Sequence, residues 1–244
     1  VLPPGIDVSR YFPYYNYELP GEEIEEIYKQ ARVRMCKELQ RFHFQGDKPL
    51  ILAVCRPERR KNINMLIESY GRDKGLQAMA NLAIFAGIRK DIEQMNPDEQ
   101  EVLTEMLLLM DRYDLYGKMA VPKQHMSETD VPELYRIAAS HRGIFVSSAY
   151  VENFGLTFLE SAATGLPFIG TDKGGPVDIV QNTGSGLLVD LADADNLTHA
   201  MHQLLADGEL WNELSTNGIN RVREFYTWKK HCRDYIRHVE SVMT

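Results

Sequence analysis

Residues 143–171 have the sequence GIFVSSAYVENFGLTFLESAATGLPFIGT, and this stretch decides the fold. It begins and ends with short, continuous apolar runs, which are typical of strands buried on both faces of a sheet. Between them a loop ends near Gly155, and the apolar-rich segment that follows suits a helix. A strand, a helix and a second strand in this order predict a parallel crossover unit.

The same alternation occurs along most of the chain. Strands are expected at 50–55, 81–87, 118–122 and 186–190, and helices at 22–42, 62–71, 98–113, 130–140 and in three segments that end at Met243. The prolines and tyrosines of residues 1–20 predict an extended, irregular start. Together these segments predict an α/β fold, with a doubly wound parallel sheet of about six strands and helices on both faces.

The composition indicates which kinds of molecule the chain is expected to bind. The chain has 244 residues, 44% hydrophobic and 25% charged, as in an ordinary soluble globular protein. Its formal net charge of −8 disfavours nucleic acid and anionic membranes, so a phosphate ligand needs a local cluster of bases. The three cysteines form no CxxC pair, and no apolar run approaches the ~20 residues of a membrane span. We therefore expect a cytoplasmic protein without a disulfide framework or a zinc site.

A basic cluster follows the first predicted strand. Ligands of open parallel sheets bind beyond the carboxyl ends of the strands, so the loops after Cys55, Gly87, Val121, Ser148 and Thr171 are the places to search. The first of these loops, RPERRKN, contains Arg56, Arg59, Arg60 and Lys61. Arginine with lysine is a common pair for diphosphate oxygens, and a solvated basic turn is the alternative.

Two carboxylates flank the predicted helix start at Gly155. Unpaired backbone N–H groups at a helix start suit a phosphate or a sugar hydroxyl, and a glycine there lets a ligand approach the backbone. Glu152 and Glu160 could accept hydrogen bonds from two different vicinal diols. The alternatives are an acid that complements the helix dipole for Glu152 and an exposed helix position for Glu160. The segment TDKGGPVDIV, residues 171–180, offers a second glycine-rich turn to a ligand.

Several familiar sites lack their motifs. The chain has no GxGxxG after the first strand and no GxxxxGK[ST], so dinucleotide and P-loop readings lose their main support. His125 and His141 are each interpreted as surface or hydrogen-bonded residues rather than catalytic ones. No cluster of metal ligands is present, so we expect neither a metal ion nor a cofactor.

The combined motifs resemble a known family. The pattern Arg56-x4-Lys61, the pair Glu152-x7-Glu160 and the segment GLPFIGTDKGGPVDIV are similar to the carboxyl-terminal domain of retaining glycosyltransferases of family 4, which have the GT-B fold. Further segments resemble the sucrose-phosphate synthase branch of that family, namely VLPPGID, RPERRKN, NLAIFAGIR, MLLLMDRYDLYGKMAVPKQH and FYTWKKHCRDYI. Sucrose synthase and mannosylfructose-phosphate synthase are near neighbours.

The resemblance implies a division of the chain and a role for each motif residue. Residues 1–46 would be the interdomain linker and leading helix, 47–226 the Rossmann-like domain that binds a nucleotide sugar, and 227–244 a crossover helix. It assigns catalytic roles to Arg56 and Lys61 at the diphosphate and to Glu152 at the hexose. It assigns donor binding to Gly87, Arg89 and Val121 near the base or the phosphates, to Asn153, Phe154, Gly155, Leu156 and Thr157 along the sugar and phosphate, and to Glu160 at the ribose. Asn153 departs from the family, which commonly has Pro or Ala at this position.

The implied reaction transfers glucose from UDP-glucose to fructose 6-phosphate, giving sucrose 6-phosphate and UDP. Because VLPPGID resembles the interdomain linker, we expect Val1 to follow an amino-terminal acceptor domain, without which the chain binds its donor but transfers little. The last helix would then expose an apolar side, which allows the isolated domain to form a homodimer. GDP-mannose as donor, a sucrose synthase-like reaction and a non-catalytic nucleotide-sugar-binding module stay open as alternatives.

Overall fold

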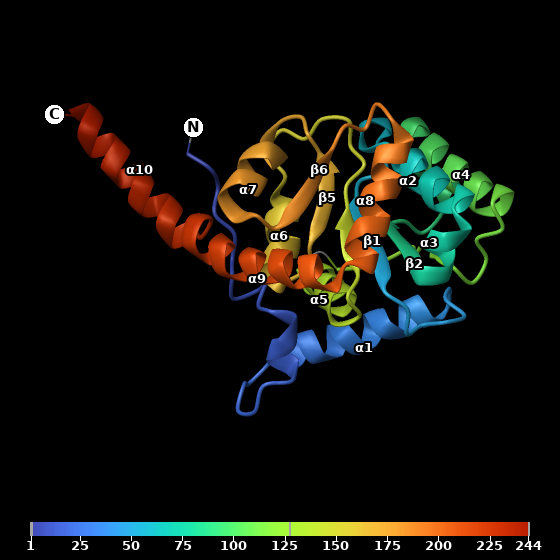
Figure 1. Ribbon diagram of the computed structural model, residues 1–244, viewed down its shortest axis with the longest axis horizontal. Coiled ribbons are helices and arrows are strands. Elements are labelled where there is room, and N and C mark those ends of the chain that lie inside the picture. The colour runs from blue at the N-terminus through green and yellow to red at the C-terminus, as the bar shows by residue number, and fades with distance from the viewer. Residues whose placement is uncertain (1, 127, 244) are drawn as a thin grey trace.

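A single parallel sheet forms the centre of the computed structural model, which describes residues 2–126 and 128–243 (Figure 1). Within these residues six strands pair in the order β3-β2-β1-β4-β5-β6. Their bounds are β1 Leu50–Cys55, β2 Asn81–Ala86, β3 Met119–Ala120, β4 Ile144–Val146, β5 Phe168–Thr171 and β6 Gly186–Val189. The predicted doubly wound α/β fold is therefore confirmed. Val1, which we expect to follow an acceptor domain, lies outside the described residues, as does Thr244.

Helices cover both faces of the sheet. Their bounds are α1 Glu26–Gln40, α2 Ile63–Arg72, α3 Lys74–Met79, α4 Pro97–Arg112, α5 Asp130–Ser140, α6 Leu156–Thr164, α7 Gly175–Thr183, α8 Ala194–Ala206, α9 Gly208–Phe225 and α10 Trp228–Met243. Alternate residues of β1 point to opposite faces, as strand geometry requires. Ile51 and Ala53 pack with α2, α4 and α8, whereas Leu50 and Leu52 pack with α1, α5 and α6. This two-sided burial explains why the central strands are continuous apolar runs.

The leading helix and a short helix differ from the prediction. Helix α1 begins at Glu26 rather than at residue 22. A start at residue 22 would place Glu22 and Glu26 one helical turn apart, where like charges repel. Helix α3 was not predicted, because its six residues are too few for a clear period. It is started by Asp73, whose side chain accepts a hydrogen bond from the Leu76 amide at 2.9 Å.

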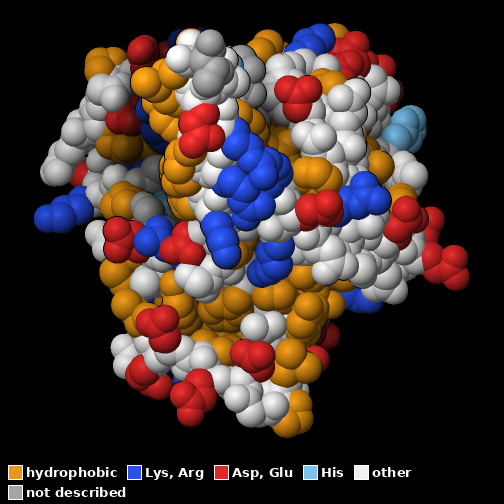
Figure 2. Space-filling model, turned by 90° about the vertical axis from the view of Figure 1, so that its left-hand side faces the viewer, with side chains coloured by type: hydrophobic (Ala, Val, Ile, Leu, Met, Phe, Trp, Pro, Cys, Tyr) orange, Lys and Arg blue, Asp and Glu red, His pale blue; other side chains and the backbone are white. Residues whose placement is uncertain are grey.

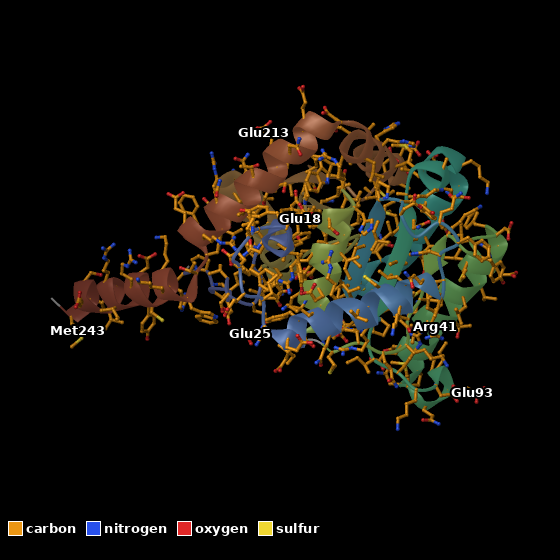
Figure 3. All side chains as sticks on the ribbon, turned by 90° about the horizontal axis from the view of Figure 1, so that it is seen from below. Glu18, Glu25, Arg41, Glu93, Glu213 and Met243 are labelled. Atoms are coloured by element: carbon orange, nitrogen blue, oxygen red, sulfur yellow. The ribbon has the colours of Figure 1, made fainter. Side chains whose placement is uncertain are left out.

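The amino-terminal segment lies beside the junction between α9 and α10. The Ile6 amide donates to the Tyr226 carbonyl at 2.8 Å, and His231 Nδ1 lies 2.7 Å from the Pro3 carbonyl oxygen. Helix α10 then projects away from the rest of the molecule and buries none of its residues (Figures 1 and 3). Met243, labelled in Figure 3, lies at the far end of this helix. Across residues 2–126 and 128–243, no helix combines the length and hydrophobicity needed to span a bilayer.

Candidate functional site

A cleft of about 820 Å³ lies at the carboxyl ends of the central strands, where the sequence predicted a ligand site. Segments far apart in the chain line it: the end of β1, the loops after β1, β2 and β4, the start of α6 and part of the amino-terminal segment. Six of the predicted site residues are among its lining residues, namely Arg56, Lys61, Gly87, Glu152, Thr157 and Glu160. The cleft therefore brings together the basic loop and both carboxylates of the Glu-x7-Glu motif.

The basic loop leaves β1 and forms a short 3-10 turn over Arg59–Lys61. Glu58 lies between two of its arginines: Arg56 Nε is 3.0 Å from one carboxylate oxygen, and Arg60 Nε is 2.6 Å from the other. Arg59 turns away and pairs with Glu101 on α4. The Arg56 side chain is 71% exposed, so it can reorient toward a ligand at little cost.

Lys61 and Glu152 form an ion pair that the sequence did not predict. Lys61 Nζ is 2.6 Å from Glu152 Oε2, and the two side chains are only 15% and 16% exposed. The Ser148 hydroxyl fixes the same two loops together by donating to the backbone carbonyls of Lys61 and Asn62, at 3.0 and 2.9 Å. The residue predicted to bind the diphosphate, Lys61, is thus in direct contact with the residue predicted to bind the hexose, Glu152.

The second glycine-rich turn, at Gly174 and Gly175, packs against the backbone of Glu152. The Gly175 amide donates to the Glu152 carbonyl at 2.9 Å, so this amide is not free to meet a ligand, and the prediction is wrong for Gly175. At Gly174, φ is +94° and a Cβ atom would lie 2.2 Å from the Glu152 carbonyl oxygen. A glycine is therefore required there so that the backbone can approach the Glu152 loop.

Helix α6 begins as predicted, with Gly155 at its N-cap in the left-handed region at φ +94°. A Cβ atom on Gly155 would lie 2.4 Å from the Phe158 ring. The left-handed backbone and the nearby Phe158 ring therefore account for a glycine at this position. The close approach of a ligand, which the sequence suggested as the reason, is not needed to explain it. Asn153 and Leu156 are exposed, and Phe154 packs edge-on against Tyr226, 6.4 Å between ring centroids. Contacts from the backbone of 153–157 to a donor stay a prediction.

Glu160 lies on the cleft side of α6 and is mostly buried, so the alternative of an exposed helix position is wrong. Burial raises the pKa of its carboxyl, and interactions with the hydroxyl groups of Tyr11 and Tyr135 oppose that shift. Tyr135 donates to Glu160 Oε2 at 3.5 Å. Tyr11 belongs to the amino-terminal segment, for which the sequence predicted no role in the site.

Arg89 and Val121 lie outside this cleft. They line an adjoining hollow of about 1290 Å³ between α1, α4 and the loops after β2 and β3. The Arg89 guanidinium is buried and donates to the carbonyls of Val121 and Pro122 at 3.2 and 3.1 Å. Burial lowers its pKa. Arg89 therefore braces the loop after β3 instead of presenting a free cation, whereas Gly87 lines the main cleft.

The interpretation of the two histidines from the sequence holds for His141 and is wrong for His125, which is half-buried and whose Nδ1 has no hydrogen-bond partner among the described residues. His141 Nδ1 lies 2.9 Å from the Ile137 carbonyl at the end of α5. His125 borders both hollows and packs edge-on against Phe85, and burial lowers its pKa. Over the described ranges 2–126 and 128–243, no three His, Cys, Asp or Glu residues form a group that could hold a metal ion.

Comparison with known proteins places the chain in a family. Residues 35–221 match the family of glycosyl transferases group 1. The chain is 47% identical over 253 residues to "Probable sucrose-phosphate synthase 5" of Oryza sativa subsp. japonica, across 99% of this chain and 25% of the rice protein. It is 40% identical over 245 residues to a sucrose-phosphate synthase of Zea mays, across 98% of this chain and 23% of the maize protein. The chain thus spans about a quarter of the length of these curated relatives.

A solved structure agrees with the fold. The sucrose-phosphate synthase of Thermosynechococcus elongatus superimposes with a TM-score of 0.74 at 23% sequence identity, over 99% of this chain and 52% of that one. The resemblance to the sucrose-phosphate synthase branch and to one half of the GT-B fold is confirmed by these matches. The chain belongs to the group 1 glycosyltransferases.

Proposed function

We propose that this chain supplies the donor site of a retaining glycosyltransferase that transfers glucose from UDP-glucose to fructose 6-phosphate, giving sucrose 6-phosphate and UDP. The observation that carries the proposal is the single cleft that holds Arg56, Lys61, Glu152 and Glu160. Identities of 40% and 47% to sucrose-phosphate synthases support the choice of donor and acceptor. The acceptor site is assigned to a further domain of the complete enzyme.

The basic side chains are assigned to the leaving group. Breaking the bond between the anomeric carbon and the diphosphate places positive charge on the sugar and negative charge on UDP. Arg56 and Lys61 neutralise the diphosphate as it leaves. Lys61 is held in place by Glu152, and preorganised cations of this kind are among the strongest contributions to catalysis. In this proposal the side chains supply the charge, and no metal ion or cofactor is required.

The ion pair leaves Lys61 and Glu152 able to bind a donor. An ammonium group has three protons, and among the described residues Lys61 Nζ donates only to Glu152 Oε2. Two protons therefore remain for diphosphate oxygens. The second carboxylate oxygen, Glu152 Oε1, accepts no hydrogen bond from the described residues and is free for a hexose hydroxyl. Lys61 also orients Glu152, so the pair prepares the site for the sugar and the diphosphate at once.

Glu160 is assigned to the ribose hydroxyls. It lies on the same helix as Thr157, and Tyr11 and Tyr135 line the cleft with it. The two carboxylates therefore serve different parts of one extended ligand, with Glu152 at the hexose and Glu160 at the ribose. Gly87 lines the cleft between the loops, and we assign it to the diphosphate or the base.

Helix α10 is assigned to contact with the acceptor domain. Its exposed hydrophobic side chains are Trp228, Tyr235, Ile236, Val239, Val242 and Met243. Figure 2 looks at the side from which α10 projects, and there Lys and Arg side chains gather beside hydrophobic ones. An unpartnered amphipathic helix of this kind is a candidate interface. In the isolated chain the same helix can support a homodimer.

Titration calorimetry with UDP, ADP and GDP tests the donor assignment. It can be done on this chain, because hydrophobic clusters on both faces of the sheet give the chain a core of its own. We expect UDP to bind at least about tenfold more tightly than ADP or GDP, a difference of about 1.4 kcal/mol. Tighter binding of GDP would point to GDP-mannose as donor, and no binding of any of the three would refute the proposal. The complete enzyme is then assayed for glucose transfer to fructose 6-phosphate; binding without transfer would indicate a non-catalytic module.

A further inference from the structure

We infer that the amino-terminal segment, residues 2–13, is part of the donor site, and that Tyr11 is a positioning residue for Glu160. This inference rests on the proposed function, because it takes Glu160 as the acceptor for the ribose hydroxyls. The segment lies far from the Glu-x7-Glu motif in sequence. Arg10 and Tyr11 nevertheless line the same cleft as Glu160.

Tyr11 is placed to hold the Glu160 carboxylate. Its side chain is 7% exposed, and its hydroxyl interacts with Glu160, while its ring lies 6.4 Å from the Tyr135 ring. Tyr135 reaches the same carboxylate from α5. Tyr135 donates to this carboxylate, and Tyr11 lies beside Tyr135 in the same cleft, so we place hydroxyl groups from two elements at one carboxylate. The carboxylate lone pairs that they leave unused can accept from a ligand.

The backbone around Tyr11 is fixed from two sides. Arg136 Nη1 donates to the Arg10 carbonyl at 2.9 Å, and the Arg136 guanidinium lies 3.7 Å from the centre of the Phe12 ring. Arg223 Nη2 donates to the carbonyl of Tyr11 itself at 3.3 Å. Arg136 is fully buried on α5 and is paired with Glu133, 2.6 Å between Nη2 and Oε1. A buried ion pair and two arginine contacts to carbonyls thus hold the segment in register with Glu160.

Positioning matters here because Glu160 is largely buried. A buried carboxylate favours its neutral form, and hydrogen bonds from hydroxyl groups favour the charged form that accepts from a diol. Arg10 adds a positive charge nearby and, among the described residues, has no hydrogen-bonded or ion-paired partner for its guanidinium group. Loss of the Tyr11 hydroxyl should therefore loosen the carboxylate and weaken only those ligands that use it.

The test compares UDP with 2′,3′-dideoxy-UDP, which lacks both ribose hydroxyls, by titration calorimetry on the wild-type chain and on Tyr11→Phe. We expect Tyr11→Phe to weaken UDP binding about tenfold, as for loss of a hydrogen bond to a charged group, and to leave the dideoxy analogue unchanged. Tyr14→Phe is the matched control, because Tyr14 directly follows the segment, at the start of the 3-10 turn Tyr14–Tyr17, and packs edge-on against Trp211 at 6.2 Å instead. In a Glu160→Gln background, Tyr11→Phe should cause no further loss.

The outcomes separate this inference from the proposed function. Equal binding of UDP by Tyr11→Phe and wild type would overturn the inference, as would an equal loss for both ligands, since general damage to the segment does not depend on the ribose hydroxyls. A wild-type chain that binds UDP and its dideoxy analogue equally well would instead refute the assignment of Glu160 to the ribose. Thermal unfolding of each variant confirms that the comparison is made on folded protein.

Discussion

Removal of the Lys61 ammonium group is the sharpest test of the site. Lys61 is largely enclosed, with 15% of its side chain exposed, and its Nζ lies 2.6 Å from Glu152. Lys61→Ala therefore deletes a preorganised cation and leaves the Glu152 carboxylate without its ionic partner. We expect the complete enzyme to lose turnover while its fold stays intact.

The magnitude follows from the two consequences of that deletion. Loss of one preorganised donor to a developing negative charge typically raises the barrier by ~2.7 to 4 kcal/mol, which is about a hundredfold to a thousandfold in rate. An unpaired, half-enclosed carboxylate lowers stability by a further ~1 to 3 kcal/mol. Because Lys61 also orients Glu152, the effects of Lys61→Ala and Glu152→Gln on turnover should not add, and we expect a coupling of ~0.5 to 3 kcal/mol.

The assay measures glucose transfer to fructose 6-phosphate at saturating substrate, with urea unfolding of the same preparations. Arg59→Ala is the matched control, because Arg59 belongs to the same basic loop but is 65% exposed and pairs with Glu101. It should retain nearly full turnover. A folded Lys61→Ala enzyme with near-normal turnover would refute the role of Lys61 at the leaving group, and strict additivity with Glu152→Gln would refute the coupling of the pair.

Three further predictions concern the support of the site. Burial raises the pKa of Glu160 above its ordinary value of 4.5, so protonation should weaken UDP-glucose binding as the pH falls through a midpoint above that value, and calorimetry on Glu160→Gln should show no such midpoint. Gly174→Ala should lower the free energy of unfolding in urea by ~1 to 3 kcal/mol and weaken donor binding, because the added Cβ meets the Glu152 carbonyl. Gly46→Ala is the control: a Cβ atom added there has no neighbouring atom within 4 Å, so neither stability nor binding should change. Arg136→Met should cost ~3 kcal/mol or more in urea unfolding, since among the described residues it leaves the buried Glu133 with the Tyr17 hydroxyl at 2.8 Å and with Arg32, at 3.6 Å, as its remaining cation. Adding Glu133→Leu should recover part of that loss.

The fold was predictable because burial on both faces makes each central strand a continuous apolar run. The run at 50–55 became β1 without any change of bounds, and the run at 81–87 became β2 with one residue fewer. The run at 118–122 is the exception, because only Met119 and Ala120 pair with β2 at the edge of the sheet. Apolar character reports burial, whereas strand length depends on how far the neighbouring strand extends.

The site was predictable as a set of loops but not as a set of contacts. Parallel topology brings the carboxyl ends of the strands to one edge, so the basic loop and the Glu-x7-Glu motif were expected together. The pairing of Lys61 with Glu152 joins residues 91 positions apart, and no local pattern encodes it. The contacts of Arg89 are likewise not local: the resemblance placed it near the base or the phosphates, and in the structure two of its guanidinium nitrogens donate to backbone carbonyls of the loop after β3, 32 and 33 positions away.

Residues 2–13 show why the remaining wall of the cleft was missed. The segment has no helical or strand period, and hydrogen bonds between its backbone and other elements set its position. The Ile6 amide donates to the Tyr226 carbonyl, His231 contacts the Pro3 carbonyl, and Arg136 donates to the Arg10 carbonyl. Such contacts depend on backbone atoms, which every residue shares, and therefore leave no pattern in the sequence. Because the α9–α10 junction fixes one end of the segment and α5 fixes the other, the position of Tyr11 in the cleft that holds Glu160 is a property of the assembled fold.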